Sequence, residues 1–259
     1  MKLFYQIYGN PNRPAVLFLH GFLGSHSMWV PSISSLQEKF FCILVDLPGH
    51  GDSPIPGSYE AYSLPLLADA LATLLGDLQI TSCSLVGYSL GGRIALQLAL
   101  SHQYLVEKLI LESSSPGLKS VKERKKRIEA DEQWAAKLEQ LAMNKFLEQW
   151  YDQEIFASLK KHPDFTDLIQ KRADNDGPRL AKSLRAMSVG KQASLWNELS
   201  DLRAKLSMIT GTLDYKYQQI FRQMQALVPN AQILLVENAG HNTHFEQAED
   251  FAAILNDVL

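Results

Sequence analysis

The sequence predicts an α/β protein with a mostly parallel central sheet, helices on its flanks, and a helical cap inserted between two core strands. Short apolar runs alternate with longer helical patterns, which is typical of βαβ units and a parallel sheet. The runs are apolar throughout rather than at alternate positions, as expected of strands buried on both faces. The length of 259 residues fits a single large α/β domain.

The expected strands begin near the N-terminus and recur to the C-terminal part of the chain. They are residues 15–19, 40–47, 84–87, 109–111, 207–210 and 232–236. Helical patterns separate several of them and include residues 64–75, 94–100 and 218–227.

One long stretch, about 118–191, breaks this rhythm because it contains no convincing strand pattern. It is rich in Lys, Arg, Glu, Gln and Ala, and large apolar residues such as Trp134, Leu138 and Trp150 recur at helical spacing. Since core strands are expected on both sides, we interpret it as a helical cap within one domain covering residues 1–259.

Composition narrows the classes of partner and the compartment. The net charge of −3 gives no reason to expect nucleic-acid binding. The two cysteines, Cys42 and Cys83, lie in apolar runs and predict free, buried thiols suited to a reducing compartment, and they are too few for the usual zinc site. No N-terminal signal pattern and no apolar run of about 20 residues is present, so we expect a cytoplasmic protein without stable membrane association.

The strongest local motif is the segment Gly87–Gly92, with Ser89 between two glycines directly after a strand and before a helix. This G-x-S-x-G pattern is typical of a nucleophile elbow, in which a tight turn lifts the serine hydroxyl above the sheet. The backbone N–H of Leu90 then becomes an oxyanion donor. A chance glycine-rich turn is the alternative, but the strand–turn–helix context favours a nucleophilic or basic Ser89.

A serine hydroxyl needs a base to take its proton, and in this arrangement the acid and the histidine follow the serine in the chain. His241 follows the last expected strand, and His244 is the rival, interpreted as structural. Asp214 follows the preceding strand and is predicted to orient the imidazole. Glu112, at the end of an earlier strand, is the alternative acid.

A second oxyanion donor is expected in the loop after the first buried strand, where the N–H of Phe22 would face the same charge as that of Leu90. His20 and His50 lie in loops at this edge of the sheet and are interpreted as bracing groups.

Several cationic and aromatic residues point to an anionic substrate. Arg93 lies near the start of its helix, where a cation opposes the helix dipole, so either it binds an anion above Ser89 or it turns to the surface. The basic run 122–127 is mostly a solvated face, and spacing alone does not select the members that point inward. Arg172 is another possible anion contact, and residues 149–151 with Phe156 form either a lining or cap packing.

Together, His20-Gly21-Phe22, the segment 46–51, the elbow, and the late Asp214 and His241 resemble the α/β-hydrolase superfamily over essentially the whole chain. The resemblance implies the α/β-hydrolase fold. A serine at the nucleophile position argues against the dehalogenase and epoxide-hydrolase branches, which use aspartate there.

A second set of segments, which extends into the cap, is similar to the SHCHC synthases. These are the 2-succinyl-6-hydroxy-2,4-cyclohexadiene-1-carboxylate synthases of menaquinone and phylloquinone biosynthesis. The segments that carry it are 87–93, 112–118, the Glu-Arg run ending at Arg127, 133–135, 150–151, 156–159, and Arg172 with Asn175 and Gly177. The sequence departs from the family at Ala248, where a proline is usual, and we expect little effect because this is the start of the last helix.

The resemblance implies a lyase that eliminates pyruvate from 2-succinyl-5-enolpyruvyl-6-hydroxy-3-cyclohexene-1-carboxylate, a small polycarboxylate. Ser89, activated by His241, would remove a carbon-bound proton, with no metal and no organic cofactor. The positions that match the family's substrate-binding set are Tyr88, Arg93, Arg127, Trp150 and Arg172.

Two other functions stay open at this point. A carboxylesterase or carbon–carbon bond hydrolase would use Ser89 as a covalent nucleophile, although an arginine-lined cap disfavours neutral esters. A binding module on a hydrolase scaffold would be expected to lack a triad member, whereas Ser89, Asp214 and His241 are all present. The oligomeric state is left open.

Overall fold

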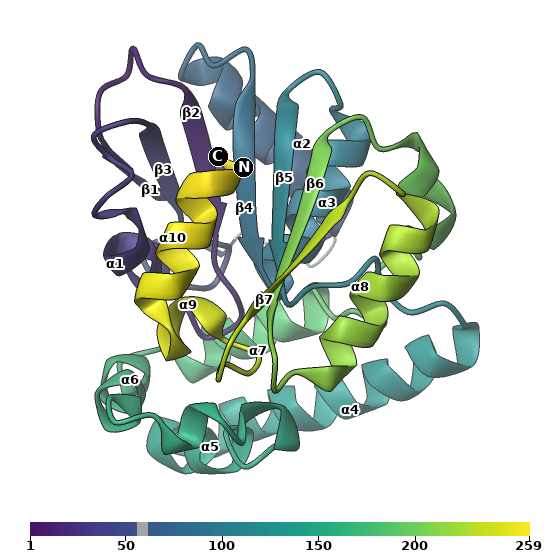
Figure 1. Cartoon of the computed structure of the whole chain (residues 1–259). Coiled ribbons are helices and arrows are strands. Elements are labelled where there is room, and N and C mark those ends of the chain that lie inside the picture. Colours follow the sequence, from purple (N-terminus) through teal and green to yellow (C-terminus); the bar gives the residue numbers. More distant parts are fainter. Residues whose placement is uncertain (56–61) are drawn as a thin grey trace.

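The computed structural model describes residues 1–55 and 62–259 and contains one seven-stranded sheet (Figure 1). The strand order is β1-β3-β2-β4-β5-β6-β7. The strands are β1 (Tyr5–Tyr8), β2 (Ala15–Leu19), β3 (Phe41–Val45), β4 (Cys83–Tyr88), β5 (Val106–Glu112), β6 (Lys205–Gly211) and β7 (Gln232–Val236). The predicted α/β class and mostly parallel sheet are confirmed, since all neighbouring strands except β1 and β3 run parallel.

Strand β1 is the one strand that the sequence pattern does not predict. It pairs antiparallel with β3 at the edge of the sheet, with Tyr5 opposite Val45 and Tyr8 opposite Cys42. Its four residues are exposed or only partly buried. An edge strand with so little burial lacks the continuous apolar run by which the inner strands are identified.

Helices cover both faces of the sheet (Figure 1). The helices outside the cap are α1 (Val30–Ile33), α2 (Leu64–Asp77), α3 (Leu90–Ser101), α8 (Tyr215–Leu227), α9 (Thr243–Glu246) and α10 (Ala248–Val258), with the 3-10 helix η1 (His26–Trp29). Apolar residues of α2, α3 and α8 pack with Leu17 and Leu85 of the sheet. Those of α1 and α10 pack with Val16 and Val86 on the other face, as the alternation of side chains along a strand requires.

Residues 113–204, between β5 and β6, contain helices and no strand. The helices are α4 (Val121–Gln140), α5 (Met143–Trp150), α6 (Phe165–Ala173) and α7 (Gly177–Ala186), with the 3-10 helices η3 (Glu154–Phe156), η4 (Leu159–Lys161) and η5 (Trp196–Asp201). Ser120 and Glu123 form a capping box at the start of α4, which satisfies backbone N–H groups there. The first four of these helices lie together beyond one end of the sheet (Figure 1), and their apolar side chains form a separate cluster that includes Phe146 and Leu180.

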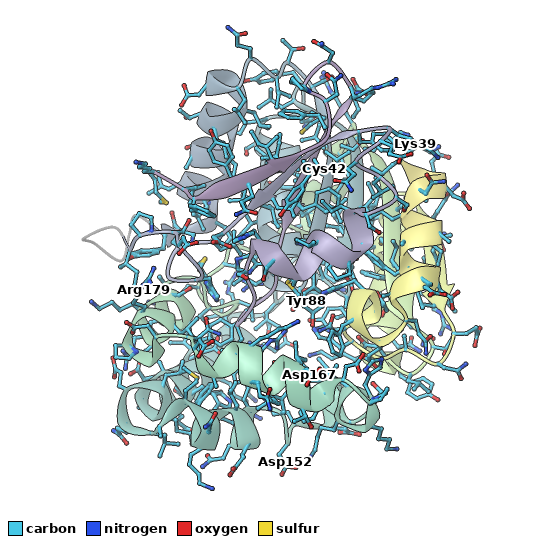
Figure 2. All side chains as sticks on the ribbon, turned by 90° about the vertical axis from the view of Figure 1, so that its left-hand side faces the viewer. Lys39, Cys42, Tyr88, Asp152, Asp167 and Arg179 are labelled. Atoms are coloured by element: carbon cyan, nitrogen blue, oxygen red, sulfur yellow. The ribbon has the colours of Figure 1, made fainter. Side chains whose placement is uncertain are left out.

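The carboxyl ends of β4, β6 and β7 face these helices (Figure 1). Parallel strands bring their carboxyl ends to one edge, so residues 89, 214 and 241 meet there despite their separation in the chain. Figure 2 shows Tyr88 where the sheet meets the cap, with Asp152 and Asp167 on the cap itself.

Two smaller expectations are also confirmed. Cys42 and Cys83 are free and buried, and burial raises the pKa of each thiol to about 12. Ala248 is the first residue of α10. Within the described ranges 1–55 and 62–259, none of the helices combines the length and apolar character needed to cross a membrane.

Candidate active site

Ser89 lies on a strained turn between β4 and α3. Its φ of 50° and ψ of −105° are rare for a residue with a side chain. Close packing holds this conformation, because a Cβ at Gly91 would lie 2.2 Å from the backbone oxygen of Leu19 and one at Gly87 would lie 2.6 Å from the Cα of Gly92. The N–H of Ser89 donates to the carbonyl of Glu112 over 2.9 Å. The turn has the geometry that a nucleophile elbow requires.

The hydroxyl of Ser89 meets the imidazole of His241, which in turn meets Asp214. Nε2 of His241 lies 3.2 Å from Oγ of Ser89, and Nδ1 lies 3.0 Å from Oδ2 of Asp214. The other carboxylate oxygen of Asp214 accepts the N–H of Tyr217. His241 and Asp214 are both buried. Asp214 therefore fixes the ring so that Nε2 can take the serine proton, which is the arrangement of a serine–histidine–aspartate relay.

The loop after β2 supplies a second backbone donor near Ser89. A Cβ at Gly21 would lie 2.5 Å from the ring of Tyr88 and 3.6 Å from the Cβ of Ser89, so glycine allows the loop to approach this closely. Among the described residues, the N–H groups of Phe22 and Leu90 have no protein acceptor. Both residues line the same cavity as Ser89. They are thus free to donate to a developing oxyanion.

His20 holds the Gly21–Phe22 peptide in place. Its Nε2 accepts the N–H of Leu47 over 2.9 Å, so the proton lies on Nδ1, which donates to the carbonyl oxygen of Gly21 over 2.7 Å. In a trans peptide the C=O and the next N–H point in opposite directions, so this bond aims the Phe22 N–H away from His20. Burial lowers the pKa of His20 to about 3, which keeps the ring neutral.

The loop that carries His241 is fixed by two buried carboxylates. Glu246 accepts the N–H of Gly240 over 2.9 Å and that of Asn242 over 3.1 Å, and these two N–H groups flank His241. Glu112 accepts Nδ1–H and the backbone N–H of His244. Glu112, the alternative acid, is therefore bound to the rival histidine and does not contact His241.

Two cavities that share several lining residues open beside Ser89. The first, here called the oxyanion-side cavity, has a volume of about 310 Å³ and is lined by Phe22, Leu90 and Arg93. The second, the histidine-side cavity, has a volume of about 580 Å³ and is lined by His241 and Phe156. The residues that line both are Ser89, Arg127, Asp131, Trp150, Lys216 and Tyr217. The relay thus lies on the wall that the two cavities share.

Arg93 and Arg127 bring positive charge to these cavities. Arg93 lines the oxyanion-side cavity, where it donates to the side chain of Gln192 and to the carbonyl of Met187, so the alternative of a surface-directed arginine is wrong. Burial lowers the pKa of Arg93 to about 10. Arg127 donates through Nε to Asp131, which leaves its terminal nitrogens without a partner among the described residues. Both side chains can therefore pair with a carboxylate.

Tyr88 and Arg172 lie beside the site, and neither lines the two cavities. The Tyr88 ring is buried between the rings of His241 and His244, with centroid distances of 5.4 and 4.9 Å. Arg172 is buried with its guanidinium 5.4 Å from the centre of the Tyr151 ring. Burial lowers its pKa to about 10. The structure therefore does not bring these two residues to the cavity wall, and their roles stay predictions.

Of the cap aromatic residues, some line a cavity and others pack inside the cap, which are the two alternatives that the sequence left open. Trp150 lines both cavities, and its ring lies 5.2 Å from that of Phe22. Phe156 lines the histidine-side cavity. Tyr151 is fully buried in the cap cluster.

Sequence patterns did not single out Glu246, Lys216 or Tyr217. Lys216 and Tyr217 lie two and three residues after Asp214, in the first turn of the helix that follows β6 at the edge of the sheet where Ser89 lies, and this position was the available signal. Among residues 1–55 and 62–259, no group of three or more His, Cys, Asp and Glu side chains is placed to hold a metal ion.

Comparisons with known proteins agree with this geometry. A family model described as the alpha/beta hydrolase fold matches residues 14–248. The 2-succinyl-6-hydroxy-2,4-cyclohexadiene-1-carboxylate synthase of Serratia proteamaculans is 35% identical over 256 residues, which cover 97% of this chain and 95% of that protein. The chain belongs to the SHCHC synthase family of α/β hydrolases.

Two further proteins are similar to this member of the SHCHC synthase family over most of its length. The structure of MenH from S. aureus superposes with a TM-score of 0.93 at 29% identity, covering 98% of this chain and 97% of that one. The chloroplastic protein PHYLLO of Arabidopsis thaliana is 34% identical over 252 residues, and the match spans 92% of this chain but only 15% of PHYLLO.

Proposed function

We propose that this chain is a 2-succinyl-6-hydroxy-2,4-cyclohexadiene-1-carboxylate synthase, a carbon–oxygen lyase that eliminates pyruvate from 2-succinyl-5-enolpyruvyl-6-hydroxy-3-cyclohexene-1-carboxylate. The product would serve menaquinone or phylloquinone biosynthesis. Curated relatives with this name cover nearly the whole chain. The observation that carries the mechanism is the assembled relay of Ser89, His241 and Asp214 on the shared wall of two cavities that contain arginine side chains.

The reaction begins with removal of a carbon-bound proton next to the succinyl ketone. His241 takes the hydroxyl proton of Ser89 through Nε2, and the serine oxygen takes the proton from carbon. The electron pair of the broken C–H bond moves toward the ketone oxygen, where the N–H groups of Phe22 and Leu90 stabilise the negative charge. Each such donor typically lowers the barrier by about 3 kcal/mol.

The second part of the reaction breaks the C–O bond to the enolpyruvyl group. The enolate electrons form a double bond between ring carbons 2 and 3, the pair of the existing 3,4 double bond moves between carbons 4 and 5, and the C–O bonding pair at carbon 5 leaves with the enolpyruvyl oxygen. Pyruvate forms when the released enolate takes up a proton, which restores the proton balance. No covalent bond to Ser89 forms, which separates this mechanism from that of an esterase.

The cations of the site orient the substrate. Arg93 and Arg127 reach the cavities from α3 and α4, and each retains hydrogen-bond capacity for a carboxylate. Tyr88, Trp150 and Arg172 complete the proposed substrate-binding set, because their positions match those of the family's binding residues. A cytoplasmic location is part of the proposal, because free buried thiols at Cys42 and Cys83 suit a reducing compartment.

The test is a pyruvate-release assay with the enolpyruvyl substrate. The parent protein is expected to release pyruvate, and Ser89→Ala is expected to reduce kcat by at least about 1,000-fold. Ser101→Ala, at the far end of α3, is the matched control and should retain parental activity. Absence of pyruvate from the parent, or an acyl adduct trapped on Ser89 during turnover, would refute the lyase and favour the hydrolase.

A further inference from the structure

Lys216 is a cation of the active site that the relay and the two arginines leave without a role. It lies in the first turn of α8, two residues after Asp214, and lines both cavities. A lysine in the first turn of a helix opposes the helix dipole and so weakens the helix slightly. Its Nζ lies 5.4 Å from the centre of the Tyr217 ring.

Among the residues that the structure describes, no carboxylate forms an ion pair with Lys216, and its ammonium makes no hydrogen bond. Asp214 acts on it electrostatically, but both oxygens of Asp214 already accept hydrogen bonds, from His241 and from the N–H of Tyr217. Asp131, on the same wall, is bound to Arg127 and Ser188. The carboxylates of Asp214 and Asp131 are therefore both engaged by other groups.

A second cation faces the same space. Arg127 lines both cavities together with Lys216 and Ser89. Although Lys216 is exposed, partial desolvation lowers its pKa and the charge of Arg127 lowers it further, while the charge of Asp214 acts in the opposite direction. Two like charges that converge on one cavity wall repel each other, and an anion between them would remove that repulsion.

We propose that the ammonium of Lys216 binds a carboxylate of the anionic substrate at the wall that the two cavities share, together with Arg127. This inference rests on the proposed function for the identity of the substrate, and it assigns one further binding residue to that site. A lysine acts as a point charge with rotatable donors, so it can follow the carboxylate, whereas Arg127 is held through Asp131.

The experiment compares Lys216→Met, Lys216→Arg and the control Lys125→Met in the pyruvate-release assay. Lys125 is exposed on α4 and lines neither cavity, so its variant removes the same charge away from the site. We expect Lys216→Met to raise KM by about tenfold or more, with a smaller change in kcat, because the contact is made equally in substrate and transition state. Lys216→Arg should restore most of the affinity, and Lys125→Met should match the parent.

Calorimetric titration with succinate gives a measurement that does not depend on turnover. Weaker succinate binding by Lys216→Met than by the parent and Lys125→Met would support the anion site even if the parent released no pyruvate, an outcome that would refute the proposed function alone. The proposal is overturned if KM and the succinate affinity of Lys216→Met stay within twofold of the parent. It is also overturned if kcat falls while KM is unchanged and arginine gives no rescue. Melting curves by circular dichroism establish that each variant is folded.

Discussion

Replacement of Glu246 by Gln tests whether the catalytic histidine depends on a buried carboxylate that does not touch it. The carboxylate accepts the N–H groups on both sides of His241, over 2.9 and 3.1 Å. Glutamine keeps one acceptor oxygen, while its NH₂ group would face the other N–H. One charge-assisted hydrogen bond, worth about 1.5–3 kcal/mol, is lost, and a buried N–H is left unsatisfied. We expect the free energy of unfolding to fall by about 2–3 kcal/mol.

The catalytic effect should exceed what the loss of stability explains. A displacement of about 1 Å at the relay can reduce the rate by about 100-fold. We therefore expect kcat for pyruvate release to fall by roughly 10- to 100-fold in Glu246→Gln, with KM nearly unchanged, since Glu246 does not line the two cavities at Ser89. Urea unfolding followed by tryptophan fluorescence gives the stability, and steady-state assays well below the unfolding transition give kcat.

The control is Glu249→Gln, which makes the same chemical change at an exposed position in the first turn of α10. It should leave both kcat and stability near the parental values. If Glu246→Gln shows the kcat and the unfolding free energy of the parent, the two N–H groups do not need the carboxylate, and the explanation for the position of His241 is wrong.

Three other predictions follow from packing and charge. Burial lowers the pKa of His20 and of His50 to about 3, so between pH 6.5 and that value only the unfolded chain binds these protons. Each histidine should therefore lower the free energy of unfolding by about 2 kcal/mol between pH 7 and pH 5, measured by urea unfolding. His50→Asn should show a weaker dependence of stability on pH. Gly91→Ala would place a Cβ 2.2 Å from a backbone oxygen of β2, so we expect loss of pyruvate release or of soluble expression, and an active, stable variant would contradict the packing argument. Arg185 joins α7 to Glu132 on α4 over 2.8 Å, and Arg185→Ala should lower the unfolding free energy by about 1 kcal/mol, less in high salt.

The strands and the relay were predictable because local signals determine both. A strand buried on both faces has a continuous apolar run, as in β2 and β3. Strand β7 was found by the same kind of run, but the expectation of burial is wrong for it, because it lies at the edge of the sheet and only Val236 is buried. Ser89, Asp214 and His241 follow such runs at turns, so chain order alone assigns them to one sheet edge. Strand β1 was not predicted because it pairs with β3 at the edge of the sheet and has no buried apolar run.

The cavity wall was less predictable because it depends on how the cap packs. Within the basic run, helical spacing could not distinguish Arg127 from its neighbours. In the structure α7 packs along α4, and Asp131, one turn after Arg127, is buried against Ser188, which turns Arg127 toward the cavities. Lys216 was missed for a related reason, since its exposure to a cavity depends on the cap helices opposite it.

The origin of the cations explains why an anionic substrate suits this site better than a neutral ester. Arg93 comes from α3 at the elbow, Arg127 from α4 in the cap, and Lys216 from α8 beside the catalytic aspartate. Burial or desolvation lowers the pKa of Arg93 and of Lys216, which means that each loses favourable hydration in the folded protein. A neutral ester would offer these cations no opposite charge beyond the pairing of Arg127 with Asp131, whereas a polycarboxylate could pair with all three and would hold α3, α4 and α8 around the reacting carbon. On the proposed function, the relay would supply the proton transfer, and the convergence of three cations from separate elements would select the substrate on which that transfer acts.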